Sequence, residues 1–134
     1  MDYDYPALVT LLSLLLYWVL LFNVGRARGK YGIKAPAVVG NPAFERVFRV
    51  HQNTLESLAM HLPALWLFSD YVSDGWAGIL GAVWIVERIL YACSYYADAA
   101  KRGPGMLIST LATMVLLIGA LIGVGLSFYQ GGSQ

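Results

Sequence analysis

Long apolar segments alternate with short polar connections along the whole chain. Four such segments are recognisable, at residues 6–25, 44–71, 76–100 and 104–129. Each is long enough to cross the roughly 30 Å hydrocarbon core of a bilayer as an α-helix, which needs about 20 residues. The pattern predicts an all-α integral membrane protein, a single-domain bundle of four transmembrane helices. Asp74, just before the third segment, is the predicted cap of that helix.

Composition agrees with this class. Of the 134 residues, 58% are hydrophobic and only 13% are charged, whereas soluble domains average about 25% charged residues. The formal net charge of +1 gives no reason to expect nucleic acid as a partner. A single cysteine, Cys93, excludes an internal disulfide and any multi-cysteine metal site, and it is expected to serve packing. Two scattered histidines predict no metal site either.

Basic residues are concentrated in two of the predicted connections. The connection after the first helix, 26–43, and the one after the third, 101–105, hold six of the nine Lys and Arg residues: Arg26, Arg28, Lys30, Lys34, Lys101 and Arg102. On the opposite side of a four-span protein, the charged residues would all be acidic: Asp2, Asp4, Asp70 and Asp74. The positive-inside rule therefore predicts that both basic loops are cytoplasmic and that both termini lie on the other side of the membrane.

A set of polar residues falls on one face of each of the second and third predicted helices. In the second segment the face comprises Arg46, Arg49, Asn53 and Glu56. In the third it comprises Arg88, Tyr91, Tyr95, Asp98 and Arg102. At about 100° per residue, each set occupies a sector of roughly 80°. With four spans, both sets lie in the cytoplasmic half, and we expect one polar layer.

Two interpretations of this layer stand side by side. In the first, the charges form structural ion pairs between helices, with arginines reaching toward the membrane surface. In the second, they bind a ligand, because ionisable groups at membrane depth usually face a protein interior or a wet cavity. Arginines clamp carboxylates, while a glutamate and an asparagine suit an ammonium and a peptide group. The residues alone leave open which zwitterionic or dianionic ligand this is.

Several segments resemble the MAPEG family, the membrane-associated proteins of eicosanoid and glutathione metabolism. They are ARGKY at 27–31, APAVVGNP at 35–42, FERVFR at 44–49, HQNTLE at 51–56 and WIVERILYA at 84–92. The last two look most like microsomal glutathione transferases of the type-three branch. The spacing of Arg88, Tyr91, Tyr95 and Arg102 is similar to that of leukotriene-C-forming synthases.

The resemblance implies a homotrimer of four-helix subunits with glutathione, the co-substrate, bound at each subunit interface. The residues it implies for glutathione binding are Arg28, Arg49, Gln52, Asn53, Glu56, Arg88, Tyr91 and Tyr95. Arg28 would reach in from the neighbouring subunit. Arg102 would be the catalytic residue that stabilises the glutathione thiolate, with Lys101 as the competing candidate. No metal is implied.

The expected function is glutathione transfer to lipophilic electrophiles from the bilayer, or glutathione-dependent reduction of lipid hydroperoxides. A non-catalytic lipid-binding or adaptor protein of the same fold is the alternative, because this chain has Ser57 where many relatives carry an aromatic residue after the glutamate. A small multidrug transporter is a further rival, but it would need a membrane-embedded carboxylate in the first helix, and the segment 6–25 has none.

Overall fold

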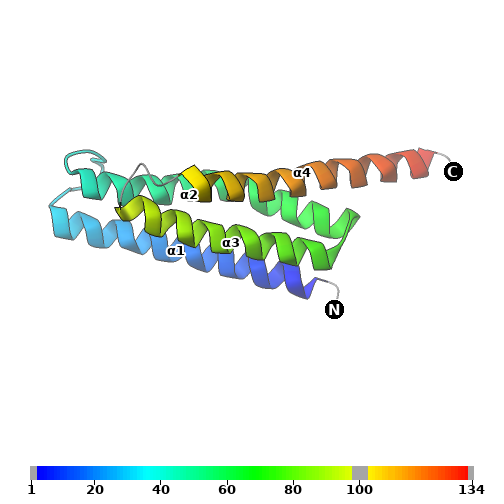
Figure 1. Cartoon of the computed structure of the whole chain (residues 1–134), viewed down its shortest axis with the longest axis horizontal. Coiled ribbons are helices and arrows are strands. Elements are labelled where there is room, and N and C mark those ends of the chain that lie inside the picture. Colours follow the sequence, from blue (N-terminus) through cyan, green and yellow to red (C-terminus); the bar gives the residue numbers. More distant parts are fainter. Residues whose placement is uncertain (1–2, 98–102, 133–134) are drawn as a thin grey trace.

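The computed structural model describes residues 3–97 and 103–132, in which all regular secondary structure is α-helix. The helices are α1 (Asp4–Tyr31), α2 (Pro42–Tyr71), α3 (Asp74–Ala97) and α4 (Gly103–Gly132). They form an elongated bundle in which α2 and α3 pack against each other and against both outer helices, while α1 and α4 lie on opposite sides (Figure 1). The start of α1 and the end of α4 lie at one end of the bundle, and the α1–α2 connection lies at the other. The predicted all-α four-helix fold is confirmed.

The helix bounds differ from the predicted segments mainly at the end of α1. This helix ends at Tyr31 rather than at residue 25. Hydropathy marks the end of an apolar span, whereas the residues that follow are mostly good helix formers that continue the helix as a polar extension. Gly32 stops it in the left-handed conformation, with φ of 69°, which glycine adopts without steric penalty.

Side-chain caps define the starts of α2 and α3. Asn41 accepts hydrogen bonds from the backbone N–H groups of Ala43 and Phe44 at 2.9 and 3.1 Å, and Pro42 occupies the first turn, as such starts favour. At α3 the cap is Ser73, whose hydroxyl accepts from the N–H of Trp76 at 3.2 Å. The prediction of Asp74 as this cap is wrong, because Asp74 lies inside the first turn and accepts a hydrogen bond from the Ser69 hydroxyl.

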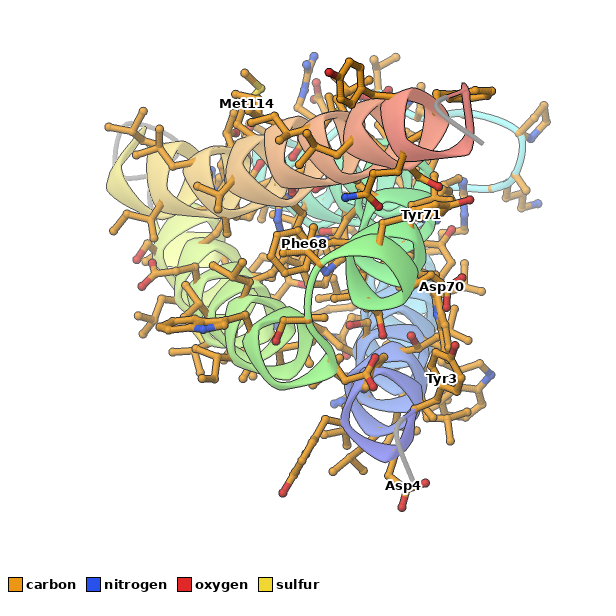
Figure 2. All side chains as sticks on the ribbon, turned by 90° about the vertical axis from the view of Figure 1, so that its right-hand side faces the viewer. Tyr3, Asp4, Phe68, Asp70, Tyr71 and Met114 are labelled. Carbon is orange, nitrogen blue, oxygen red and sulfur yellow. The ribbon has the colours of Figure 1, made fainter. Side chains whose placement is uncertain are left out.

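Glycines allow two of the helix pairs to approach closely. A Cβ added at Gly81 of α3 would lie 2.7 Å from Cγ2 of Val9 in α1. A Cβ added at Gly119 of α4 would lie 2.5 Å from the ring of Phe68, which points from α2 into the bundle (Figure 2). Gly119 of α4 therefore packs against α2 of the same chain.

Among the residues that the structure describes, three helices are long and apolar enough to cross a membrane: α1, α3 and residues Leu107–Gly131 of α4. The prediction of four such spans is thus met by three. The exception is α2, whose 30 residues would suffice in length but which includes the charged Glu45, Arg46, Arg49 and Glu56. Large apolar side chains are exposed on the outer faces of the other helices, among them Leu15, Trp18, Val86, Leu111 and Ile122. Such surfaces suit lipid or a second protein chain, and the protein is an integral membrane protein.

Candidate functional site

A pocket of about 240 Å³ lies between α2 and α4, with one side chain of α3 at its base. Its lining residues are Asn53, Glu56, Ser57, Met60, Arg88, Thr110, Thr113 and Met114. Met114 projects from α4 at the surface of the bundle (Figure 2). The pocket is open to the outside, and it combines an apolar rim with one carboxylate, one amide and one guanidinium.

Arg88 is the most unusual residue of the pocket because it is an almost fully buried cation, with an exposed fraction of 2%. Its Nη1 donates to Oδ1 of Asn53 at 2.7 Å, and its Nη2 donates to Oγ of Ser109 at 3.0 Å. The guanidinium carbon lies 4.8 Å from the ring centre of Tyr91 and 5.7 Å from that of Trp84, within the range of a cation–π interaction.

All of these contacts to Arg88 are neutral. Within the described residues no carboxylate pairs with it, and its Nε–H is buried without an acceptor. A guanidinium has five N–H donors, and the two hydrogen bonds leave capacity for a further acceptor. An unpaired buried charge is expensive, so the arrangement suits an anionic group entering from the pocket.

A second buried layer supports the floor of the pocket. The indole Nε1–H of Trp84 donates to the hydroxyl of Ser57 at 3.0 Å. One turn further along the same face of α2 lies His61, whose ring stacks on Trp84 with centroids 4.5 Å apart and an interplanar angle of 9°. Ser57, which stands where many relatives carry an aromatic residue, therefore accepts a hydrogen bond from the tryptophan that Arg88 contacts.

Five of the predicted binding residues have clear places near the pocket. Asn53, Glu56 and Arg88 line it. Tyr91 lies under the guanidinium, and the Tyr95 ring lies 5.7 Å further along α3 from the ring of Tyr91. Glu56 is exposed at the pocket wall and has no ion-pair partner among the residues that the structure describes.

The other predicted binding residues do not line the pocket. Arg49 and Gln52 are exposed on α2. Arg28 binds within its own chain, donating to the carbonyl oxygen of Ala37 at 2.7 Å and lying 5.1 Å from the ring centre of Phe44. The predicted catalytic residue Arg102, its competitor Lys101 and the face residue Asp98 lie outside the described residues.

Structural ion pairs do not account for the polar layer in the part of the chain that the structure describes. Arg46 bonds to a neutral acceptor, donating from Nε to the carbonyl oxygen of Tyr96 at 3.2 Å. Arg88 likewise binds only neutral groups. The expectation for Cys93 is wrong as well, because this side chain is exposed on α3 rather than packed.

Sequence reasoning missed the contribution of α4. Its residues Ser109 and Thr113 are buried, and Thr110 lines the pocket. The available signal was the grouping of three hydroxyl residues within one turn and a half of an otherwise apolar segment. Hydroxyls in such a segment are expected to face other helices rather than lipid.

Comparison with known proteins agrees with this architecture. The model of the MAPEG family matches residues 6–122. An uncharacterised protein of Synechocystis is 54% identical over 120 residues, which are 90% of this chain and 88% of that protein. Human microsomal glutathione S-transferase 2 is 39% identical over 91% of this chain and 83% of its own. Leukotriene C4 synthase of the guinea pig, Cavia porcellus, is 34% identical over 88% and 79%, respectively.

The matched region contains all of α2 and α3 and most of α1, and it extends along α4 to residue 122. It therefore includes every residue that lines the pocket around Arg88. With a family match over this region and three described helices long and apolar enough to cross a membrane, the chain belongs to the MAPEG family of membrane proteins.

Proposed function

We propose that the protein is a membrane-bound glutathione transferase, acting on lipophilic electrophiles or lipid hydroperoxides that arrive from the bilayer. The observation that carries the proposal is Arg88, a buried guanidinium that opens to a pocket and has no carboxylate partner in the described chain. Glutathione has two carboxylates, one α-ammonium and two peptide groups. The relatives named as glutathione transferases support this choice of ligand.

Within the pocket, complementary chemistry assigns a part to each polar side chain. Arg88 binds a carboxylate of glutathione through its free N–H donors. Glu56 binds the α-ammonium. Asn53 uses its carbonyl oxygen for Arg88, which leaves its amide N–H groups to donate to a peptide carbonyl. Tyr91 and Tyr95 contribute from α3.

The chemical step requires the glutathione thiolate. A thiol has a pKa of about 8.5 and is mostly protonated at neutral pH. We assign Arg102 to stabilise the thiolate, which then attacks the electrophilic carbon of the acceptor or the terminal oxygen of a hydroperoxide. In the second case a sulfenic acid of glutathione forms with release of an alcohol, and a second glutathione converts it to the disulfide and water.

A homotrimer would complete the site. At about 240 Å³ the pocket is smaller than the roughly 300–1,000 Å³ typical of small-molecule sites. Its wall includes the exposed Glu56, and Arg49 and Gln52 are exposed on the preceding turns of α2. We propose that a neighbouring subunit covers this side and brings its Arg28 to the ligand. We further propose that the α1–α2 connection is cytoplasmic and that both termini lie across the membrane, which labelling of single introduced cysteines would test.

The binding part is tested by changing the ligand rather than the protein. Calorimetry on the detergent-solubilised protein should detect binding of glutathione. Glutathione diethyl ester, which lacks both carboxylates, should bind about 10–100-fold more weakly. Equal binding of the two would contradict the assignment of Arg88. Absence of glutathione binding would favour the lipid-binding or adaptor alternative.

The catalytic part is tested by ultraviolet difference absorbance of the thiolate. Wild-type protein should show the signal, and Arg102→Ala should lose it while still binding glutathione. Lys101→Ala distinguishes the two candidates. If this variant, and not Arg102→Ala, lost the thiolate signal, Lys101 would be the residue that stabilises the thiolate. Lys34→Ala, which removes an exposed positive charge from the α1–α2 connection, is the control for a general charge effect.

A further inference from the structure

We infer that Ser109 is a positioning residue that holds the Arg88 guanidinium toward the pocket with a neutral anchor, so that the positive charge of Arg88 stays available to an anionic ligand. The inference rests on the proposed function and deepens it. It assigns a role to a residue of α4, a helix to which sequence patterns gave no part in the site.

The first support is the geometry of the anchor. The Ser109 hydroxyl is fully buried and accepts from Nη2 of Arg88 at 3.0 Å. Asn53 accepts from Nη1 at 2.7 Å. These acceptors come from α4 and α2, on two different nitrogens of one planar group. Two such bonds fix both the position and the plane of the guanidinium.

The second support is the buried polar surroundings of Ser109. One turn further along α4, the Thr113 hydroxyl donates to the backbone carbonyl of Ser109 at 3.1 Å, and it lies 3.5 Å from Nδ1 of the buried His61. The anchor therefore belongs to a buried polar cluster that joins α2, α3 and α4. The Ser109 hydroxyl is fully buried in this cluster, and a side chain locked by packing adds precision to the group that it contacts.

The third support is the chemistry of both anchors. A carboxylate in place of either would pair with Arg88 and neutralise it, since charge-assisted bonds are about twice as strong as neutral ones. The charge would then be satisfied inside the protein, and a ligand carboxylate would have to compete for it. A hydroxyl and an amide orient the guanidinium without this competition.

This reasoning predicts losses of binding that differ in size for two variants at one position. Ser109→Ala removes the anchor and should weaken glutathione binding about fivefold to tenfold. Ser109→Asp replaces it with an internal counter-ion and should weaken binding by about a hundredfold or more, while the protein remains folded and at least as resistant to unfolding as Ser109→Ala. Ser109→Thr, which keeps the hydroxyl, should restore binding, and Ser127→Ala, at an exposed serine of the same helix, is the matched control.

A ligand comparison separates positioning from general structural damage. The Ser109→Ala penalty, measured by calorimetry, should appear with glutathione and disappear with whichever of its two monoethyl esters lacks the carboxylate that Arg88 binds. Equal penalties for glutathione and both monoesters would mean a structural role and would overturn the inference. So would wild-type binding by Ser109→Asp. If wild-type protein bound no glutathione at all, the proposed function would fail first, and the two failures are therefore distinguishable.

Discussion

The contact between α1 and α3 makes Gly81→Ala a demanding test of the bundle. The added Cβ would lie 2.7 Å from Cγ2 and 3.1 Å from Cβ of Val9, with Leu65 at 3.4 Å. Apolar carbons prefer separations of about 3.5–4.0 Å, so the shortest contact is about 1 Å too close. Valine in a helix has one strongly preferred rotamer, and its Cβ is fixed to the backbone. The strain cannot be relieved by rotating a long side chain, and the two helices must move apart.

The expected magnitude follows from two opposing effects. Overpacking of a well-packed interior costs about 1–3 kcal/mol. Replacing glycine by alanine inside a helix gains about 1 kcal/mol from propensity. The net effect should therefore be a loss of roughly 0–2 kcal/mol in the free energy of unfolding. Gly125→Ala in α4 is the matched control, because nothing lies within 4 Å of its added Cβ, and it should be neutral or stabilising.

The free energy of unfolding can be measured by titrating sodium dodecyl sulfate into mixed micelles and following helical circular dichroism. Adding Val9→Ala to Gly81→Ala removes the closest atom, so the double variant should recover about 1 kcal/mol relative to the sum of the single changes. If Gly81→Ala proved as stable as Gly125→Ala, or if the changes at residues 9 and 81 were additive, the close approach of α1 and α3 would be refuted.

Three further changes test other parts of the molecule. Asn41→Ala removes the cap of α2 and should cost about 1 kcal/mol of unfolding free energy, whereas Asn41→Asp should retain most of it. Ser57→Ala leaves the indole N–H of Trp84 without its acceptor and should cost about 1–3 kcal/mol, with a change in tryptophan fluorescence; an unchanged stability would contradict this hydrogen bond. Arg88→Met removes a buried charge and should leave stability unchanged or raise it by about 1–3 kcal/mol while calorimetry shows no glutathione binding, and a protein that failed to fold would contradict the absence of a counter-ion.

The helices could be predicted from the sequence because apolar length is a strong signal, but their ends could not. The apolar run at 6–25 marks the part of α1 suited to lipid, and the helix continues to Tyr31 as a polar extension. The start of α3 shows a similar limit. Ser73 and Asp74 are adjacent and both suit a cap, and only the backbone geometry at that turn shows that Ser73 serves.

For the polar layer, the sequence predicts which helix face each residue occupies but not how deeply the residue is buried. Helical spacing gives the angle of a residue around its own helix, and it correctly grouped Asn53 with Glu56 and Arg88 with Tyr91. It does not give the distance of a neighbouring helix at that angle. The structure supplies this distance. Asn53 of α2 accepts a hydrogen bond from Arg88 of α3, whereas Arg49, one turn earlier on the same face of α2, is exposed.

The neutral surroundings of Arg88 connect the stability of the bundle with its proposed function. A carboxylate at the positions of Asn53 or Ser109 would stabilise the folded protein by pairing with a charge that is otherwise unbalanced. It would also remove the reason for an anion to bind. The chain instead keeps two neutral acceptors and an Nε–H without any acceptor, and so retains an unfavourable term that a ligand can relieve. Binding of an anionic ligand would then pair this charge and raise the free energy of unfolding. The free protein should accordingly be less stable than the size of its buried core suggests, and it should gain resistance to unfolding when glutathione is present.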